Sequence, residues 1–196
     1  MRGAIIMASV LGDSYAMPIG RRGFLLGALS GVAGAATLAR PRFAFATALE
    51  AHTLSFYHVH TGETLKITYR EHGVVVPGAL ATINNYLRDF RNGEKHPIDV
   101  ALLDEVCKLY CQFDCRGHFE VISAYRSPKT NEALRHVSTG VAKNSLHLEG
   151  RAIDVRLTSA PLDRLRDAAI EMRSGGVGYY PDSNFVHVDT GAFRTW

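Results

Sequence analysis

Two histidines and one aspartate stand in patterns that could bind a metal. His147 and Asp154 lie in the segment 145–154 (SLHLEGRAID), and His187 lies in the segment 185–189 (FVHVD). A catalytic zinc site needs three nitrogen or oxygen ligands from the protein and one open position for water. These three residues supply such a set, so the sequence predicts a zinc site formed by His147, Asp154 and His187.

Strand alternation separates these candidate ligands from the core. Asp154 lies between two aliphatic residues in an expected strand at 152–157, and His187 lies between two valines. Because successive side chains of a strand point to opposite faces, the ligands and the aliphatic residues should face opposite ways. Asp189 should share the face of His187. Gly150 permits a tight turn between the first histidine and the strand.

Three sequence blocks carry a resemblance to a known family. The pattern Ser-x-His-x-x-Gly-x-Ala-x-Asp at 145–154, followed by a second His, resembles the zinc D-Ala-D-Ala metallopeptidases and their hedgehog-like relatives. The block at 123–131 (SAYRSPKTN) is similar to that family's Ser-Gly-Tyr-Arg-Ser block. The run at 175–191 (GGVGYYPDSNFVHVDTG) is similar to its branch of exported murein endopeptidases, typified by MepK. The resemblance extends from about residue 53 to Trp196.

The resemblance implies a role for several residues. The two histidines and Asp154 would be the Zn²⁺ ligands, and Arg126 would stabilise the charge that develops on a tetrahedral intermediate. Ser145 is expected to hydrogen-bond the substrate. Tyr179 is expected to line the substrate groove, although alternation requires that either Tyr179 or Tyr180 packs inward.

The general base is a separate question. Carboxypeptidase members of the family carry an acidic residue three positions before the second histidine, where this chain has Asn184. We therefore expect Asp189 either to take a proton from water or to orient a ligand as an outer partner. Glu149 is the competing candidate for the base.

The resemblance further implies a zinc peptidase that cuts the peptide cross-links of peptidoglycan, with peptide stems as its partner. Similarity to the endopeptidase branch favours the 3–3 link between two diaminopimelates over the 4–3 link. One alternative is a D,D-carboxypeptidase acting on D-Ala-D-Ala stems, against which Asn184 argues. Another alternative is a non-catalytic, zinc-containing module that binds peptidoglycan.

Residues 1–46 have the features of an export leader. Arg21-Arg22 precede a moderately apolar stretch, as in a twin-arginine signal, and Ala44-Phe45-Ala46 forms a cleavage site. The expected domains are this signal peptide and a zinc murein peptidase domain at 47–196, located in the periplasm. The leader holds five arginines against Asp13, whereas the body holds 17 basic and 18 acidic residues. The body therefore lacks the basic surface that nucleic acid requires, and no membrane span is expected after cleavage. The sequence leaves the oligomeric state open.

The periodicity of the body predicts an α+β fold. Residues 53–58 and 63–70 alternate as a hairpin, and further strands are expected at 119–123, 152–157, 177–180 and 185–189. Helices are expected at 77–91, from Asp99 onward, at 128–135 and at 161–173. The segments 119–157 and 176–191 should form a small antiparallel sheet, with helices packed on one face and the zinc site on the other.

The remaining histidines and the cysteines have less specific patterns. His52, His58, His60 and His136 are expected to be ordinary surface residues. The cysteines recur four residues apart at Cys107, Cys111 and Cys115. The favoured interpretation is a set of buried small side chains. A Cys111–Cys115 disulfide across a frayed helix end, or one reactive thiol, remains possible because an exported protein meets an oxidising compartment.

Overall fold

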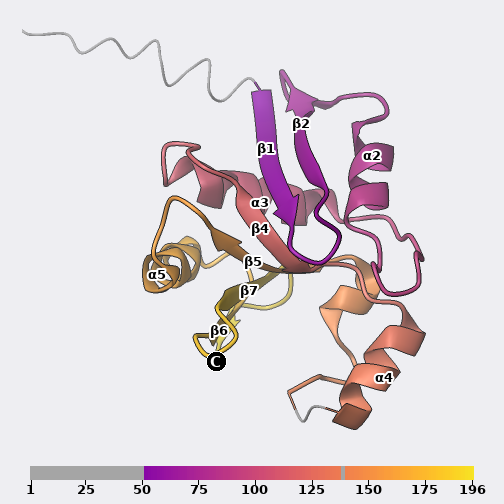
Figure 1. Ribbon diagram of the computed structural model, residues 1–196. Coiled ribbons are helices and arrows are strands. Elements are labelled where there is room, and N and C mark those ends of the chain that lie inside the picture. Colours follow the sequence, from indigo (N-terminus) through magenta and orange to yellow (C-terminus); the bar gives the residue numbers. More distant parts are fainter. Residues whose placement is uncertain (1–50, 138–139) are drawn as a thin grey trace, which may run out of the picture. The chain divides into compact units, whose positions relative to one another are not determined.

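The computed structural model describes residues 51–137 and 140–196, which all lie in one compact unit of the chain (Figure 1). The expected leader, its cleavage site and the domain boundary at 46/47 lie outside the described residues. Within the described residues, no helix is both long enough and apolar enough to cross a membrane.

One sheet organises the described residues. Its strands are β1 (Ala51–His58), β2 (Thr64–Glu71), β3 (Val74–Val75), β4 (Phe119–Ser123), β5 (Ala152–Leu157), β6 (Gly176–Tyr180), β7 (Phe185–Asp189) and β8 (Arg194–Thr195). They follow the order β3-β2-β1-β4-β5-β7-β6-β8. The pairs β1/β4 and β6/β8 are parallel and the other pairs are antiparallel. The predicted α+β class is confirmed, and the expected antiparallel sheet is present as β4-β5-β7-β6. The sheet is larger than expected and mixed, because β1 joins β4 in parallel and β8 adds a further edge.

The helices are α2 (Ala79–Tyr86), α3 (Val100–Cys111), α4 (Pro128–Val137) and α5 (Leu162–Met172), with a short 3₁₀ turn, η1 (Leu146–Glu149). Helix α2 contacts β2, α3 contacts β1, and α5 contacts β5, β6 and β7. Helix α4 follows β4 and lies away from the sheet (Figure 1). The apolar side chains of one sheet face are buried in a core with helices α2, α3 and α5. They are Leu54, Phe56, Val121, Ile153, Val155, Val186 and Val188.

Local interactions fix the ends of the helices. Asp99 caps α3 as expected, and its carboxylate accepts a hydrogen bond from the Ala101 amide at 2.9 Å. Helix α2 ends at Tyr86, although the periodicity predicted a helix to about residue 91. The Leu87 carbonyl instead accepts a hydrogen bond from the Tyr125 amide, so a tertiary contact takes the place of the next helical turn.

His58 is buried, in contrast to the surface position expected from the sequence. Its side chain is 1% exposed and lies edge-on to the ring of Phe90, at a centroid distance of 5.2 Å. Its Nδ1 accepts a hydrogen bond from the His60 amide, whereas its buried Nε2 has no hydrogen-bond partner among the described residues. Burial lowers the pKa of His58 to about 4. His58 is the last residue of β1 and lies at the end of the strand that is near α2.

The buried His58 should make stability depend on pH. Between pH 4 and 6.5 the unfolded chain binds a proton at His58 that the folded chain does not bind, so the free energy of unfolding should rise with pH by about 3 kcal/mol. His58→Phe, which keeps an aromatic ring in place, should remove this share of the dependence. The measurement is urea unfolding at several pH values, in chelator so that metal release does not contribute. His136→Gln, at an exposed histidine of α4, is the control and should keep the wild-type slope; an equal slope in His58→Phe would contradict the assignment.

Candidate metal centre

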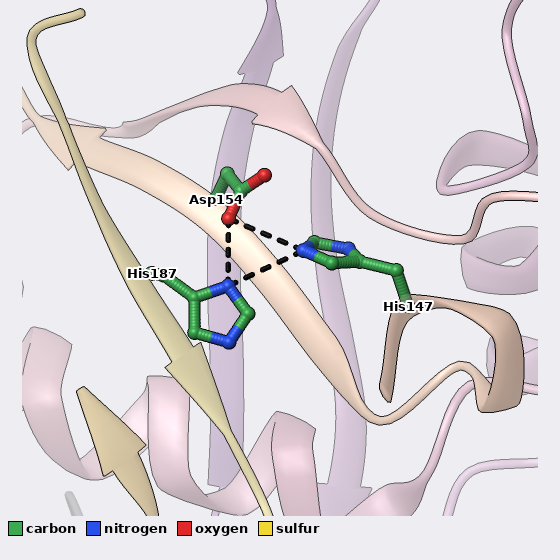
Figure 2. Close-up of side chains that lie close together, drawn as sticks. All are labelled: His147, Asp154 and His187. Atoms are coloured by element: carbon green, nitrogen blue, oxygen red, sulfur yellow. Dashed lines mark hydrogen bonds and ion pairs between the residues drawn. The ribbon is translucent and has the colours of Figure 1, made fainter. Parts of the chain in front are cut away.

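Three elements bring the candidate ligands together. Strands β5 and β7 pair antiparallel with Asp154 directly opposite His187, and η1 supplies His147 from the turn before β5. All three side chains are buried. Figure 2 shows the three side chains pointing toward one another. Because side chains alternate along a strand, Asp154 and His187 lie on the face opposite to their buried neighbours Ile153 and Val188.

The distances within this group fit one metal ion. His187 Nδ1 lies 2.8 Å from Asp154 Oδ1, His147 Nε2 lies 3.2 Å from the same oxygen, and the two nitrogens are 3.3 Å apart (Figure 2). One ligand atom from each residue falls within 4.8 Å of the others. Two imidazole nitrogens and one carboxylate oxygen are the donor set that the sequence predicted, and they could hold a metal in a three-ligand site.

The outer nitrogen of His147 is fixed by the backbone. Its Nδ1–H donates to the Ala124 carbonyl at 2.6 Å, which leaves Nε2 free to face the group. The turn that carries it ends at Gly150, whose φ of +65° and contact with the Pro97 carbonyl leave no room for a side chain. Ser145 begins the same turn, where its hydroxyl accepts a weak hydrogen bond from the His147 amide.

The outer nitrogen of His187 is fixed by Asp189. His187 Nε2–H donates to Asp189 Oδ2 at 2.8 Å, so Nδ1 is the nitrogen that faces Asp154. Asp189 is fully buried, and Arg194 donates to both of its oxygens at 2.6 and 3.1 Å. The amides of Gly176 and Gly191 also donate to its Oδ1. Burial opposes ionisation, but the hydrogen bonds from His187 and Arg194 hold the pKa of Asp189 well below its usual range.

This arrangement distinguishes the two roles that the sequence left open for Asp189. A carboxylate that already receives His187, Arg194 and two amides has little capacity left to accept a proton. It also binds the nitrogen of His187 that faces away from Asp154. The geometry therefore fits an orienting role better than that of a general base.

Arg126 lies against the ligand group from the other side. Its Nη2 donates to Asp154 Oδ2 at 2.6 Å and lies 3.1 Å from His147 Nε2, while its Nε donates to the Ser123 hydroxyl at 3.0 Å. Burial disfavours the charge of Asp154, but the neighbouring His147 and hydrogen bonds from both histidines hold its pKa well below the usual value. The carboxylate is therefore ready to bind a cation.

A pocket of about 490 Å³ opens over the group. Its lining includes the three candidate ligands, Arg126, Ser145, Tyr180, Phe185 and Trp196. Among the described residues that line it, Asp154 and Asp189 are the acidic ones. Glu149, the competing base, is exposed and pairs with Arg151 at 3.1 Å. Asn184 lies in the turn between β6 and β7 and does not line the pocket.

Tyr179 does not occupy the position expected for a substrate contact. It faces the helices, where the Arg166 guanidinium lies 4.5 Å from its ring centroid. The adjacent Tyr180 lies on the pocket face instead, stacked on Phe185 at 4.6 Å. The hairpin register pairs Tyr180 with Phe185, which places both side chains on the face of His187.

Two residues that the sequence analysis did not identify complete the site. Arg194 holds Asp189, and Trp196 packs its ring 5.2 Å from that of His187 while donating from Nε1 to the Tyr180 hydroxyl. A Cβ at Gly178 would lie only 2.7 Å from the Trp196 ring, so glycine is needed there. Neither residue belongs to a recognisable sequence motif. Both are brought to the site by the parallel pairing of β8 with β6, which is a nonlocal contact.

An α+β domain with a buried His–Asp–His group at the base of a pocket is compatible with a metalloenzyme, and the comparisons identify its family. A family model described as "Peptidoglycan L,D-endopeptidase MepK" matches residues 46–196. The protein of that name from Escherichia coli (strain K12) is 42% identical over 170 residues, which cover 86% of this chain and 93% of the relative. The "Probable peptidoglycan L,D-endopeptidase MepK" of Haemophilus influenzae is 38% identical, covering 86% of this chain and 91% of the relative. No solved structure matches the chain.

These matches cover most of the chain at substantial identity. The protein belongs to the MepK family of the M15 peptidases and is a peptidase.

Asp189→Asn should weaken metal binding. The amide cannot accept from His187 and Arg194 as the carboxylate does, so the imidazole loses its fixed orientation and affinity should fall by about 10–100-fold. The measurement is competition for zinc against a chromogenic chelator, with circular dichroism to verify folding. Glu149→Gln, which alters the exposed acid beside the motif, should leave affinity unchanged. Wild-type affinity in a folded Asp189→Asn would exclude the orienting role.

Proposed function

We propose that this protein is a zinc-dependent endopeptidase that hydrolyses peptide cross-links in peptidoglycan and takes part in remodelling the cell wall. The 3–3 link between diaminopimelates is the favoured target. The observation that carries the proposal is the convergence of His147, Asp154 and His187 beneath a pocket, in a chain of the MepK family. The names of the relatives describe an L,D-endopeptidase of peptidoglycan, and a 3–3 link is an L,D-bond.

Zinc fits the donor set. Both imidazoles have one nitrogen held by the protein, through Ala124 and Asp189, and present the other toward Asp154. This outer support is typical of histidines that bind zinc. When bound, zinc would supply Lewis acidity toward the amide carbonyl and activate water for attack.

The remaining residues of the pocket suit a peptide substrate. The Arg126 guanidinium lies within hydrogen-bond distance of two ligand side chains, so it would stabilise negative charge that develops beside the metal. The Ser145 hydroxyl is available to a polar group of the peptide stem. The aromatic surface formed by Tyr180, Phe185 and Trp196 would cover the aliphatic part of the stem and exclude water.

We also propose that the mature enzyme begins near Thr47 and acts in the periplasm after twin-arginine export. The proposal rests on the Arg21-Arg22 pair and the Ala44–Ala46 cleavage pattern. Peptidoglycan lies in that compartment, so the leader and the proposed substrate agree.

Digestion of sacculi should identify the reaction. Zinc-loaded residues 47–196 should convert cross-linked muropeptide dimers into monomers, and chelator or His147→Ala should abolish this activity. Liquid chromatography with mass detection names the bond from the monomers released. Loss of only a terminal D-Ala would replace the proposal with a carboxypeptidase, and unchanged muropeptides with a zinc-loaded protein would favour a binding module.

Replacement of Arg126 should separate catalysis from metal binding. Arg126→Ala should lower kcat by about 10²–10³-fold, because a preorganised donor to the transition state is lost, while bound zinc stays near one equivalent. Arg126→Lys should recover part of the loss. Arg135→Ala, at an arginine of α4 that pairs with Glu132 and does not line the pocket as described, is the matched control and should keep wild-type kcat. If Arg126→Ala lost its zinc but kept kcat per bound metal, Arg126 would be a structural partner of Asp154 only.

A further inference from the structure

Two cysteines meet at the end of α3, away from the candidate metal centre. Cys111 is the last residue of the helix and Cys115 lies in the turn that follows; both are exposed. Their Sγ atoms are 3.0 Å apart, closer than two unbonded sulfur atoms normally approach. Cys107 lies one turn earlier in α3 and is buried.

The backbone after α3 produces this approach. Asp114 and Cys115 take φ values of 56° and 51°, a left-handed conformation that non-glycine residues adopt only at a cost. The Cys115 amide donates to the Tyr110 carbonyl at 3.1 Å, and the Tyr110 hydroxyl donates to the Gly117 carbonyl at 2.6 Å. The chain therefore turns back over the end of the helix and places Cys115 on Cys111. A cysteine pair four residues apart inside a continuous helix would not meet in this way.

The surroundings of the two thiols favour a bond over free thiolates. Although both thiols are accessible, partial desolvation by the surrounding turn raises the pKa of Cys111, and the same effect together with Cys111 and Asp114 raises the pKa of Cys115 to about 12. In reactive dithiols the thiolate is stabilised, which makes the disulfide easy to reduce. Here the thiolates are disfavoured and would be poor leaving groups, so a disulfide between them would resist reduction and serve a structural role.

We propose that Cys111 and Cys115 form a structural disulfide in the exported protein, and that Cys107 remains a free thiol. The thiolate of Cys111 attacks a protein or small-molecule disulfide, breaks its S–S bond and releases one of its sulfurs as thiolate. The thiolate of Cys115 then attacks Cys111 Sγ and releases the second sulfur. The two cysteines lose two electrons and two protons, and the oxidant becomes a dithiol. Cys107 also hydrogen-bonds Cys111, but its side chain is buried in the hydrophobic core, whereas Cys115 Sγ is the sulfur that lies 3.0 Å from Cys111 Sγ.

The bond would fix the strained turn that joins α3 to β4. It goes beyond the proposed function, since it requires an oxidising compartment but neither zinc nor catalysis. Its tests therefore measure thiols and stability rather than hydrolysis.

The first test counts thiols in the full chain expressed with export and purified without reductant. After alkylation in denaturant, mass spectrometry should find one alkyl group, on Cys107, and a peptide with Cys111 joined to Cys115 and two hydrogens lighter than the dithiol. Reduction before alkylation should give three alkyl groups. Cys107→Ser should keep the linked peptide. Three alkyl groups without reduction, even after treatment with oxidised glutathione, or a bond that includes Cys107, would overturn the proposal.

The second test measures stability. A disulfide that closes so short a loop should raise Tm by about 5 °C, so the oxidised wild type should melt above both its reduced form and Cys111→Ser/Cys115→Ser. Cys107→Ser should show the same separation between its oxidised and reduced forms. Equal Tm values for oxidised and reduced wild type would reject the structural role. Because no step measures peptidoglycan cleavage, an inactive enzyme with an intact disulfide would reject only the proposed function.

Discussion

The antiparallel register of β5 and β7 is the constraint on which the candidate metal centre depends. Asp154 and His187 are direct partners in that register, and their neighbours Ile153 and Val188 are buried on the opposite face. A shift of one residue would turn the two candidate ligands into the core and the aliphatic side chains toward the pocket. Burial of the aliphatic side chains on the opposite face therefore fixes the register that holds the ligand group in place.

The buried carboxylates of the candidate metal centre are stable because each has cationic partners. Asp154 receives Arg126 and both histidines, and Asp189 receives His187 and Arg194. A buried carboxylate without a partner would destabilise the folded protein more than an intact buried ion pair stabilises it. The same pairing fixes which imidazole nitrogen faces the pocket. The geometry that avoids this cost therefore also directs the second nitrogen of each imidazole toward Asp154.

Two arginines line the pocket and each donates to a buried carboxylate. Arg194 donates to both oxygens of Asp189, which two backbone amides also reach, whereas Arg126 donates to Asp154 Oδ2 and lies close to His147 Nε2. Arg194 therefore supports the outer partner of His187, while Arg126 contacts the candidate ligands themselves. Two arginines with similar ion pairs differ in role because of which carboxylate each one contacts.

The local sequence pattern correctly predicted the positions of those residues that are fixed by their neighbours along the chain. Alternation in 152–157 and 185–189 placed Asp154 and His187 on one face, and Asp99 was identified as the cap of α3. The sequence also contains the reason why Tyr179 faces away from the pocket. The length of the turn pairs Tyr180 with Phe185, and this pairing sets the sheet face of each tyrosine. Arg194 could not have been found, since its contact depends on a parallel pairing between β8 and β6 that no local pattern encodes.

Nonlocal contacts likewise explain where the predicted elements were misjudged. Helix α2 was expected to continue because its apolar spacing continues, but the chain leaves the helix where Leu87 bonds to Tyr125 and Asp89 accepts from the Ser127 amide and hydroxyl. Those contacts anchor the segment that carries Arg126. A stronger local helix would have taken the Leu87 carbonyl from Tyr125, so the interruption of the helical pattern helps to position a residue of the proposed active site.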